Sequence, residues 1–316
     1  MPDRTMPDRR PFAPTFSELL AVQEGVFARW QECIDAPTRH LIRSQVRARR
    51  WQLWSPRVVV ASNGALTPVQ LRWAALLHCG QDAVLCDATA AELGGLRGYE
   101  SSEVHVSVPR GAHVVAPSGV LLHWRRDRPV DPQPARQPRR DRIRIALVDM
   151  TGSTRDPRRA CAVLAAGVQQ RLVLASALRA EIDRRARARH KQLLLNVLGD
   201  IDGGAHALGE INFAQLCRKY GLPPPTRQTI RRDRRGRRRY LDVYWDEWHL
   251  VVEIDGAAHM EVEAWWADMS RQNGIVLGAN RVLRFPSAVL RIDPAVVMDE
   301  VTAGLIQGGW RPGIRP

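Results

Sequence analysis

The alternation of hydrophobic and polar residues near the C-terminus predicts a pair of β-strands. Over residues 240–245 (YLDVYW) and 250–255 (LVVEID), side chains alternate between two faces with a period of two residues. A two-residue loop at 247–248 would join the strands as a hairpin and set Asp242 directly opposite Glu253. The pattern therefore predicts two adjacent carboxylates on a mostly apolar scaffold.

Carboxylates in these positions indicate a metal site. Like charges that face each other in a sheet are destabilising, and the valine and isoleucine neighbours indicate largely buried strands, so a positive charge should offset the repulsion. Asp255 lies one step beyond Glu253 on the same face. Oxygen ligands of this kind suit Mg²⁺ or Mn²⁺ better than zinc. In the alternative interpretation, Asp242 and Asp255 are turn or edge residues and Glu253 is a solvated strand position.

The residues on either side of the hairpin predict further elements of the same domain. The apolar spacing over 208–220 predicts a helix with Glu210 in its first turn, within reach of the same cluster. After the hairpin, the sequence pattern predicts a helix over residues 261–280 and a strand over residues 282–285. The expected order is therefore helix, strand, strand, helix, strand.

The segment from Glu210 to Leu305 resembles the family of bacterial proteins related to very-short-patch-repair (Vsr) endonucleases, within the PD-(D/E)xK nuclease superfamily. The resemblance rests on the Glu210 helix, the strand RRYLDVYW, the block VVEIDGAAH, the Asp268–Arg271 pair and the strand RVLRF. It implies an α/β (α+β) fold with a restriction-endonuclease-like mixed sheet flanked by helices. It also implies a nuclease that uses Mg²⁺, with Mn²⁺ as a possible substitute.

The resemblance also implies roles for individual residues. Asp242 and Glu253 would bind the metal, and Arg271 and Arg284 would orient groups or bind phosphate. The superfamily uses a lysine to steady the attacking water, and this chain has Asp255 at that position. The related repair enzymes also lack the lysine and use a downstream histidine. His259 is the expected substitute, as a general base or phosphate contact, and the alternative for His259 is a helix N-terminal or surface histidine. For Asp268 and Arg271, the alternative is that they form only an intrahelical ion pair. The implied catalytic set is Asp242, Glu253, Asp255, His259 and Glu210.

The charge of the chain favours a nucleic-acid partner. Lys and Arg number 47 against 33 Asp and Glu, a net charge of +14, and binding to phosphates through arginine should weaken steeply with salt. Arginines cluster over 125–144, 179–191 and 227–239. The last cluster runs into the Asp242 strand and would deliver a phosphate backbone to the metal, unless it is only a solvated hairpin loop. Its candidate DNA contacts are Arg235, Arg237, Arg238 and Arg239.

The N-terminal region predicts a winged-helix-like DNA-binding module. The expected elements are short helices over 16–23 and 26–33, a basic helix over 38–49 and a hairpin over 51–61. This order would place the basic helix in a DNA groove, and the segment resembles the N-terminal domain of AbiEi-type antitoxins. A solvated helix face is the alternative for the same arginines. The candidate DNA contacts on the basic helix are Arg39, Arg43 and Arg47.

The middle of the chain has weaker signals. The pattern predicts strands over EVHVSVPRG, GVLLHWRRD and residues 143–149. It predicts a helix over 157–167 and one or two helices over 174–199, whereas the prolines of 125–144 predict a loop. The histidines at 78, 105, 113 and 123 show no ligand spacing, so we interpret them as structural or surface residues. The five cysteines form no CxxC pair and are expected to be reduced core thiols.

These expectations give a domain plan and a function. The plan is a disordered tail over 1–14, a winged-helix-like module over 15–63, an α/β region over 64–202, the Vsr-like nuclease domain over 203–306 and a tail over 307–316. Without a long apolar run or a signal peptide, we expect a cytoplasmic protein with no membrane partner. The expected function is metal-dependent DNA endonuclease. The alternative is a non-catalytic DNA-binding regulator or antitoxin with a degenerate nuclease fold. RNA cleavage is a third hypothesis. A partner toxin and the oligomeric state are unknown.

Overall fold

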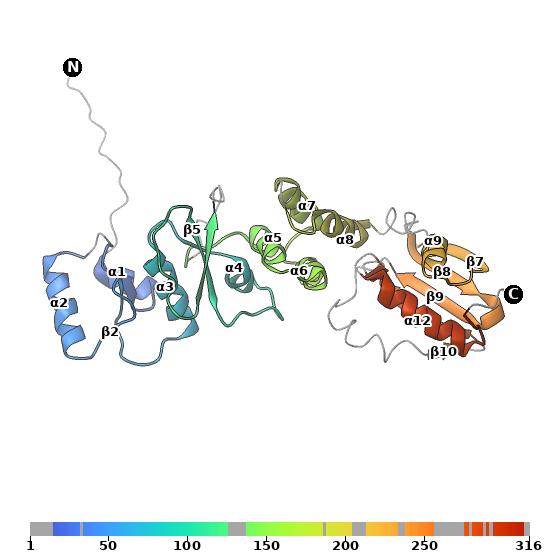
Figure 1. Ribbon diagram of the computed structural model, residues 1–316. Coiled ribbons are helices and arrows are strands. Elements are labelled where there is room, and N and C mark those ends of the chain that lie inside the picture. The colour runs from blue at the N-terminus through green and yellow to red at the C-terminus, as the bar shows by residue number, and fades with distance from the viewer. Residues whose placement is uncertain are drawn as a thin grey trace, which may run out of the picture. The chain divides into compact units, whose positions relative to one another are not determined.

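The computed structural model is a mixed α/β structure, in agreement with the predicted fold class, and its described part contains three small β-sheets (Figure 1). Two compact units divide the chain: Met1–Leu93 with Glu100–Arg142, and Gly94–Tyr99 with Ile143–Pro316. The expected boundaries at 63 and 203 lie inside these units. No helix in the described part is long and apolar enough to cross a membrane. The structure describes residues 15–31, 34–125, 137–185, 188–203, 213–232, 238–255, 275–277, 280–286, 289–290 and 293–312.

The first unit begins with two helices and a small antiparallel sheet of strand order β1-β3-β2. Side chains cap both helices: Thr15 forms a capping box with Glu18, and Asp35 accepts a hydrogen bond from the Thr38 N–H. The predicted basic helix and hairpin are confirmed. The elements are α1 (Phe16–Val22), β1 (Val26–Ala28), α2 (Ala36–Arg47), β2 (Gln52–Leu53) and β3 (Val58–Val60).

The predicted helix over 26–33 is wrong, because β1 occupies its start. Glu24 and Gly25 have φ of 53° and 77°, and this left-handed backbone follows α1 and prevents a helix from continuing. The residues of β1 are all fully buried and pair with β3. A short run of buried apolar residues fits either kind of element, so the pattern alone did not distinguish them.

The second sheet of this unit contains two of the strands predicted for the middle of the chain, EVHVSVPRG and GVLLHWRRD. Strand β4 pairs antiparallel with β5, and β5 pairs in parallel with β6. Residues of α3 join both sheets of the unit in one hydrophobic core. The elements are α3 (Pro68–Cys79), β4 (Val84–Leu85), α4 (Asp87–Leu93), β5 (Val104–Pro109) and β6 (Val120–Arg125).

Four helices open the second unit, and one of them replaces a predicted strand. Residues 143–149 belong to α5, which packs against α6 and α7. Four consecutive residues, 145–148, are buried, so α5 is apolar on most sides and lacks the 3.6-residue periodicity that marks an amphipathic helix. The helices predicted over 157–167 and 174–199 are confirmed. The four are α5 (Ile143–Ser153), α6 (Pro157–Gln169), α7 (Ala175–Asp183) and α8 (Lys191–Gly203).

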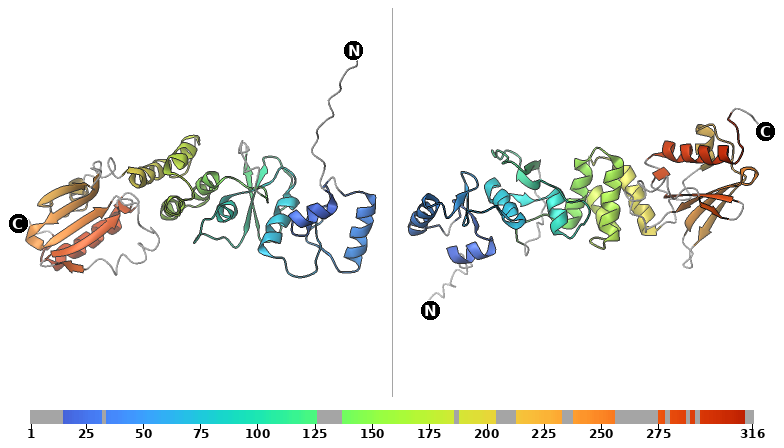
Figure 2. Two further views of the ribbon diagram at one scale, coloured as in Figure 1. Left: turned by 180° about the vertical axis from the view of Figure 1, so that it is seen from behind. Right: turned by 90° about the horizontal axis from the view of Figure 1, so that it is seen from below.

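The C-terminal part of the second unit is a five-stranded sheet of order β10-β11-β9-β8-β7. Strands β9 and β11 pair in parallel, and the other neighbours are antiparallel. Helices α9 and α12 share one hydrophobic core with a single face of the sheet (Figure 2). The elements are α9 (Phe213–Lys219), β7 (Arg227–Arg232), β8 (Arg238–Trp245), β9 (Leu250–Asp255), β10 (Ile275–Leu277), β11 (Asn280–Pro286) and α12 (Pro294–Gln307).

The predicted register of the β8–β9 hairpin is confirmed, although its loop is longer than predicted. Asp242 lies opposite Glu253, and the last pair is Trp245 with Leu250. The connection contains a 3₁₀ turn, Asp246–Trp248, followed by His249 with φ of 47°. A two-residue turn at 247–248 needs residues that tolerate positive φ, which Glu and Trp do not.

The helices predicted on either side of this hairpin are described only in part. The helix over 208–220 appears as α9, Phe213–Lys219, and residues 204–212 lie outside the described residues. The end of the helix predicted over 261–280 is wrong, because Ile275–Leu277 forms β10 and Asn280 begins β11. An Ile-Val-Leu run is well suited to a strand. Residues 256–274 lie outside the description.

The described cysteines are core thiols, as predicted. Cys79, Cys86, Cys161 and Cys217 are free and buried, and Cys33 lies outside the described residues. Burial raises the pKa of Cys79, Cys161 and Cys217 to about 12 each. These three thiols therefore remain protonated, and poorly nucleophilic, at neutral pH.

The end of α12 packs against the β8–β9 loop at a position that requires glycine. A Cβ atom on Gly308 would collide with the backbone oxygen of Trp248. We expect Gly308→Ala to lower the free energy of unfolding of this domain by about 1–3 kcal/mol, because backbone must move to relieve the overlap. Thermal unfolding of both proteins measures the change. The control is Gly152→Ala, at a glycine of the same unit without positive φ and with nothing within 4 Å of its added Cβ; an equal loss in both variants would contradict the packing explanation.

Candidate functional site

A row of polar residues crosses the C-terminal sheet on the face opposite its hydrophobic core. The strand register aligns Thr229 of β7 with Asp242 of β8, then Glu253 of β9 and Arg284 of β11. Residues in register on neighbouring strands project from the same face. The following residues of the three central strands all belong to the core on the other face: Val243, Ile254 and Phe285.

Asp242 is the buried member of this row. The residue is only 2% exposed, and its Oδ2 accepts a hydrogen bond from the Tyr244 hydroxyl at 3.3 Å. Arg227 lies over the Tyr244 ring, 4.0 Å from its centroid, and holds that tyrosine in place. Because burying a carboxylate costs free energy unless it is paired or hydrogen-bonded, a buried aspartate opposite a glutamate is a costly arrangement for a purely structural strand.

Glu253 has a cationic partner on the next strand. The Arg284 Nε donates to Glu253 Oε2 at 2.8 Å, and the two side chains are 64% and 27% exposed. A positive charge therefore stands beside the paired carboxylates, where the sequence led us to expect a cation. An ion pair this exposed contributes only about 0–1 kcal/mol to stability, because water screens it.

The carboxylates of Asp242 and Glu253 fit a hard divalent cation. They are adjacent oxygen donors on rigid strands, which is the chemistry that Mg²⁺ accepts, and Mg²⁺ usually keeps several waters beside one or two carboxylates. The backbone of Asp255 continues β9 opposite Tyr240, but its side chain is outside the description. Glu210, His259 and Arg271 lie outside the described residues. The structure therefore brings together Asp242, Glu253 and Arg284 from the predicted set.

The basic helix of the first unit presents its arginines to solvent. Arg39, Arg43 and Arg47 are all exposed, at intervals of four residues that place them along one side of α2. In the second unit, Arg238 and Arg239 begin β8, with side chains that are not described, and Arg235 and Arg237 lie outside the described residues.

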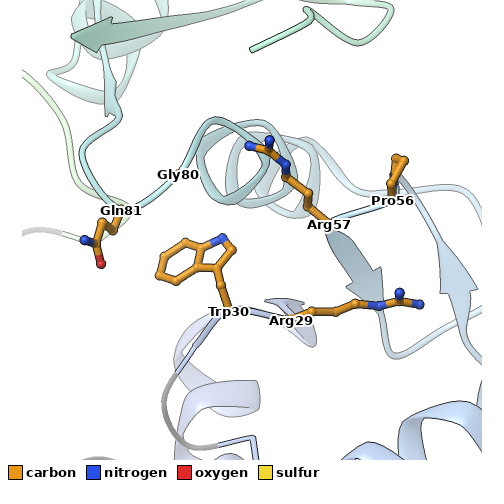
Figure 3. Close-up of a pocket in the computed structure, with 6 residues that line it drawn as sticks. All are labelled: Arg29, Trp30, Pro56, Arg57, Gly80 and Gln81. Atoms are coloured by element: carbon orange, nitrogen blue, oxygen red, sulfur yellow. The ribbon is translucent and has the colours of Figure 1, made fainter. Parts of the chain in front are cut away.

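In the first unit, a shallow hollow of about 610 Å³ lies beside the sheet of β1, β2 and β3 (Figure 3). Trp30 occupies its centre, is 42% exposed, and donates its indole N–H to the Leu77 carbonyl at 3.2 Å. Exposed aromatic rings with arginines nearby stack on nucleic-acid bases, although the anchored indole also serves to fix β1 to α3. The lining residues are Arg29, Trp30, Pro56, Arg57, Gly80 and Gln81.

A third group of polar residues was missed by the sequence analysis. His105 and His123, interpreted above as structural or surface histidines, lie together with Asp87. Their separation of eighteen residues matches no ligand motif. The available signal was one histidine on each of two predicted strands, but only a parallel pairing of those strands brings the two rings together.

The comparisons with known proteins add no assignment. No protein-family model matches the chain, and no curated protein matches it.

Proposed function

We propose that the chain is a Mg²⁺-dependent DNA endonuclease whose site is the polar row of the C-terminal sheet. The observation that carries the proposal is the buried Asp242 directly opposite Glu253. The resemblance of Glu210 to Leu305 to Vsr-like nucleases of the PD-(D/E)xK superfamily supports the same chemistry. The proposal includes Mn²⁺ as a substitute for Mg²⁺.

Three residues of the row and the neighbouring Tyr244 have a part in this proposal. Asp242 and Glu253 would hold the metal, and Tyr244 orients the Asp242 carboxylate through its hydroxyl. When bound there, Mg²⁺ would supply charge neutralisation at the scissile phosphate and a more acidic water. Arg284 would exchange Glu253 for a phosphate oxygen, a change with little cost because the ion pair is largely exposed.

Cleavage assays with a matched pair of variants test the proposal. Purified protein is incubated with supercoiled, linear and mismatch-containing DNA, and with RNA of equal length, in Mg²⁺ or Mn²⁺. We expect wild type to cleave DNA and Glu253→Gln to be at least about 100-fold slower, since loss of even outer-sphere metal partners costs 10–100-fold. Glu247→Gln, on the exposed loop of the same hairpin, should retain wild-type activity. Cleavage that persists in Glu253→Gln would reject this site.

The first unit would supply sequence-independent affinity for DNA through α2. We expect Arg39→Gln, Arg43→Gln and Arg47→Gln in combination to weaken DNA binding and to reduce the slope of log affinity against log salt by about 2–3, because each phosphate contact contributes about 0.9 to that slope. Fluorescence anisotropy at several salt concentrations gives the slope. Arg110→Gln, an exposed arginine of the same unit, is the control; an unchanged slope in the triple variant would remove α2 from the interface.

The second candidate function is DNA-binding regulation without catalysis, with the C-terminal domain as a degenerate nuclease fold of a regulator or antitoxin. The Glu253–Arg284 ion pair favours it, because the repulsion between the carboxylates is already relieved by a side chain. Asp255, at the position of the superfamily lysine, favours it too. In this case wild type, Glu253→Gln and Glu247→Gln would bind DNA equally and none would cleave it.

A further inference from the structure

Three side chains from separate elements of the first unit converge on one point. Asp87 begins α4, His105 lies in β5 and His123 lies in β6. The His105 Nδ1 is 3.0 Å from His123 Nε2 and 3.5 Å from Asp87 Oδ1. One donor atom from each of the three residues lies within 4.8 Å of the other two. Two imidazole nitrogens and a carboxylate oxygen are thus arranged around a single small volume.

The local fold produces this convergence. In the parallel register of β5 and β6, His105 faces Leu121 and Ser107 faces His123, so the histidines are diagonal neighbours on one face. Their rings stack with centroids 5.2 Å apart and an interplanar angle of 21°. Asp87 has φ of 49°, a conformation that aspartate tolerates better than most residues, and its Oδ1 accepts the Ala88 N–H at 2.7 Å.

Ser101 is placed to orient the His105 ring so that Nδ1 carries a lone pair toward a metal. Ser101 Oγ lies 3.1 Å from the other ring nitrogen, Nε2. When Ser101 accepts the Nε2–H, Nδ1 is left unprotonated and faces the other two donors; metal-binding histidines are oriented by such outer hydrogen bonds. Arg125, two residues beyond His123, pairs with the buried Asp141 at 2.7 Å, so its charge is neutralised locally.

We propose that Asp87, His105 and His123 bind a divalent transition-metal ion of the zinc class. Tetrahedral zinc holds nitrogen and oxygen ligands at about 2.0–2.1 Å, which places them about 3.3–3.4 Å apart. The measured 3.0 and 3.5 Å lie on either side of that value. Three protein ligands leave a fourth position for water, and His123 is only half-buried, so solvent reaches the site.

This site is separate from the proposed nuclease row and its outcome does not depend on that proposal. Its donors are mainly nitrogen, whereas Mg²⁺ selects oxygen. A bound ion would connect α4 to both β5 and β6, and would stabilise the first unit by binding its folded state.

Titration of the metal-free full-length protein with Zn²⁺ tests the site. Isothermal titration calorimetry should give one zinc equivalent that Mg²⁺ does not displace. Asp87→Asn and His123→Gln should each weaken zinc binding at least about 100-fold, and Ser101→Ala about 10-fold, because ligands matter more than the groups that orient them. His113→Gln, an exposed histidine on the β5–β6 connection, should bind zinc as wild type does.

Co²⁺ provides a second measurement that needs no variant. Bound at this site in wild type, it should give the visible absorption bands of four-coordinate cobalt, and Zn²⁺ should abolish them. The proposal is overturned if wild type gives no bands and no zinc equivalent, or if zinc binding survives unchanged in folded Asp87→Asn and His123→Gln. The cluster would then be a hydrogen bond between two histidines beside an aspartate.

Discussion

Asp242→Asn is expected to slow DNA cleavage at least about 100-fold while leaving the domain as stable as wild type or slightly more stable. The amide matches the shape of the carboxylate but removes the charge that a metal requires, and metal ligands matter at least as much as the outer groups whose loss costs 10–100-fold. Removing one of two opposed charges also relieves repulsion with Glu253 by about 0.2–1 kcal/mol. Initial cleavage rates and thermal unfolding of the same preparations give both values.

This variant is informative because its cleavage rate should fall while its stability stays the same or rises. Loss of activity through unfolding would lower the melting temperature, whereas loss of a metal ligand leaves it unchanged or raises it. Glu247→Gln is the matched control, since Glu247 is exposed on the loop of the same hairpin, and it should behave as wild type. Full cleavage by Asp242→Asn would show that the buried carboxylate takes no part in the reaction.

Trp245→Ala is expected to reduce the stability of the C-terminal sheet by about 3–5 kcal/mol. The Trp245 side chain is fully buried, meets Phe213 edge-on with centroids 6.1 Å apart, and donates its indole N–H to the Pro223 carbonyl at 3.0 Å. Truncation leaves a large cavity between the sheet and α9 and an unpaired carbonyl. Because the chain has two units, the measurement should be local: amide hydrogen exchange of peptides from β8 and β9.

A conservative replacement separates the two contributions of this tryptophan. Trp245→Phe keeps an aromatic ring beside Phe213 but loses the hydrogen bond, so the loss should be smaller, with about 0.5–1.5 kcal/mol from the hydrogen bond. Exchange in α5 and α6 should remain unchanged in both variants. Equal losses for Ala and Phe would mean that the hydrogen bond to Pro223, rather than ring packing against α9, supplies the stabilisation.

The part of the candidate site that could be predicted is the part built by local pairing. The alternation in 240–245 and 250–255 fixes which side chains of each strand face the core. Shifting the strand pairing by one residue would place every core side chain on the wrong face. For that reason the opposition of Asp242 and Glu253 was predicted correctly even though the loop was not. The confirmed helices over 157–167 and 174–199 also carry a recognisable helical pattern.

The remaining features depend on contacts between distant residues. Val26–Ala28 and residues 145–148 of α5 are both runs of buried residues, and only their packing partners decide that the first is a strand and the second part of a helix. The Asp87, His105 and His123 cluster requires two strands to pair in parallel, and the Arg284–Glu253 ion pair requires β11 to lie beside β9. Neither pairing leaves a periodic signal along the chain.

The parallel pairing of β9 with β11 sets the order in which the domain assembles. The β8–β9 hairpin closes through a short loop, within about 1–10 μs for a typical hairpin, and it already places Asp242 against Glu253. Arg284 follows Glu253 by 31 residues and joins only after a crossover connection, which is slower because a longer loop must close. As the full chain folds, the hairpin therefore brings the two carboxylates together before Arg284 reaches Glu253, and a cation from solution has the first opportunity to neutralise them.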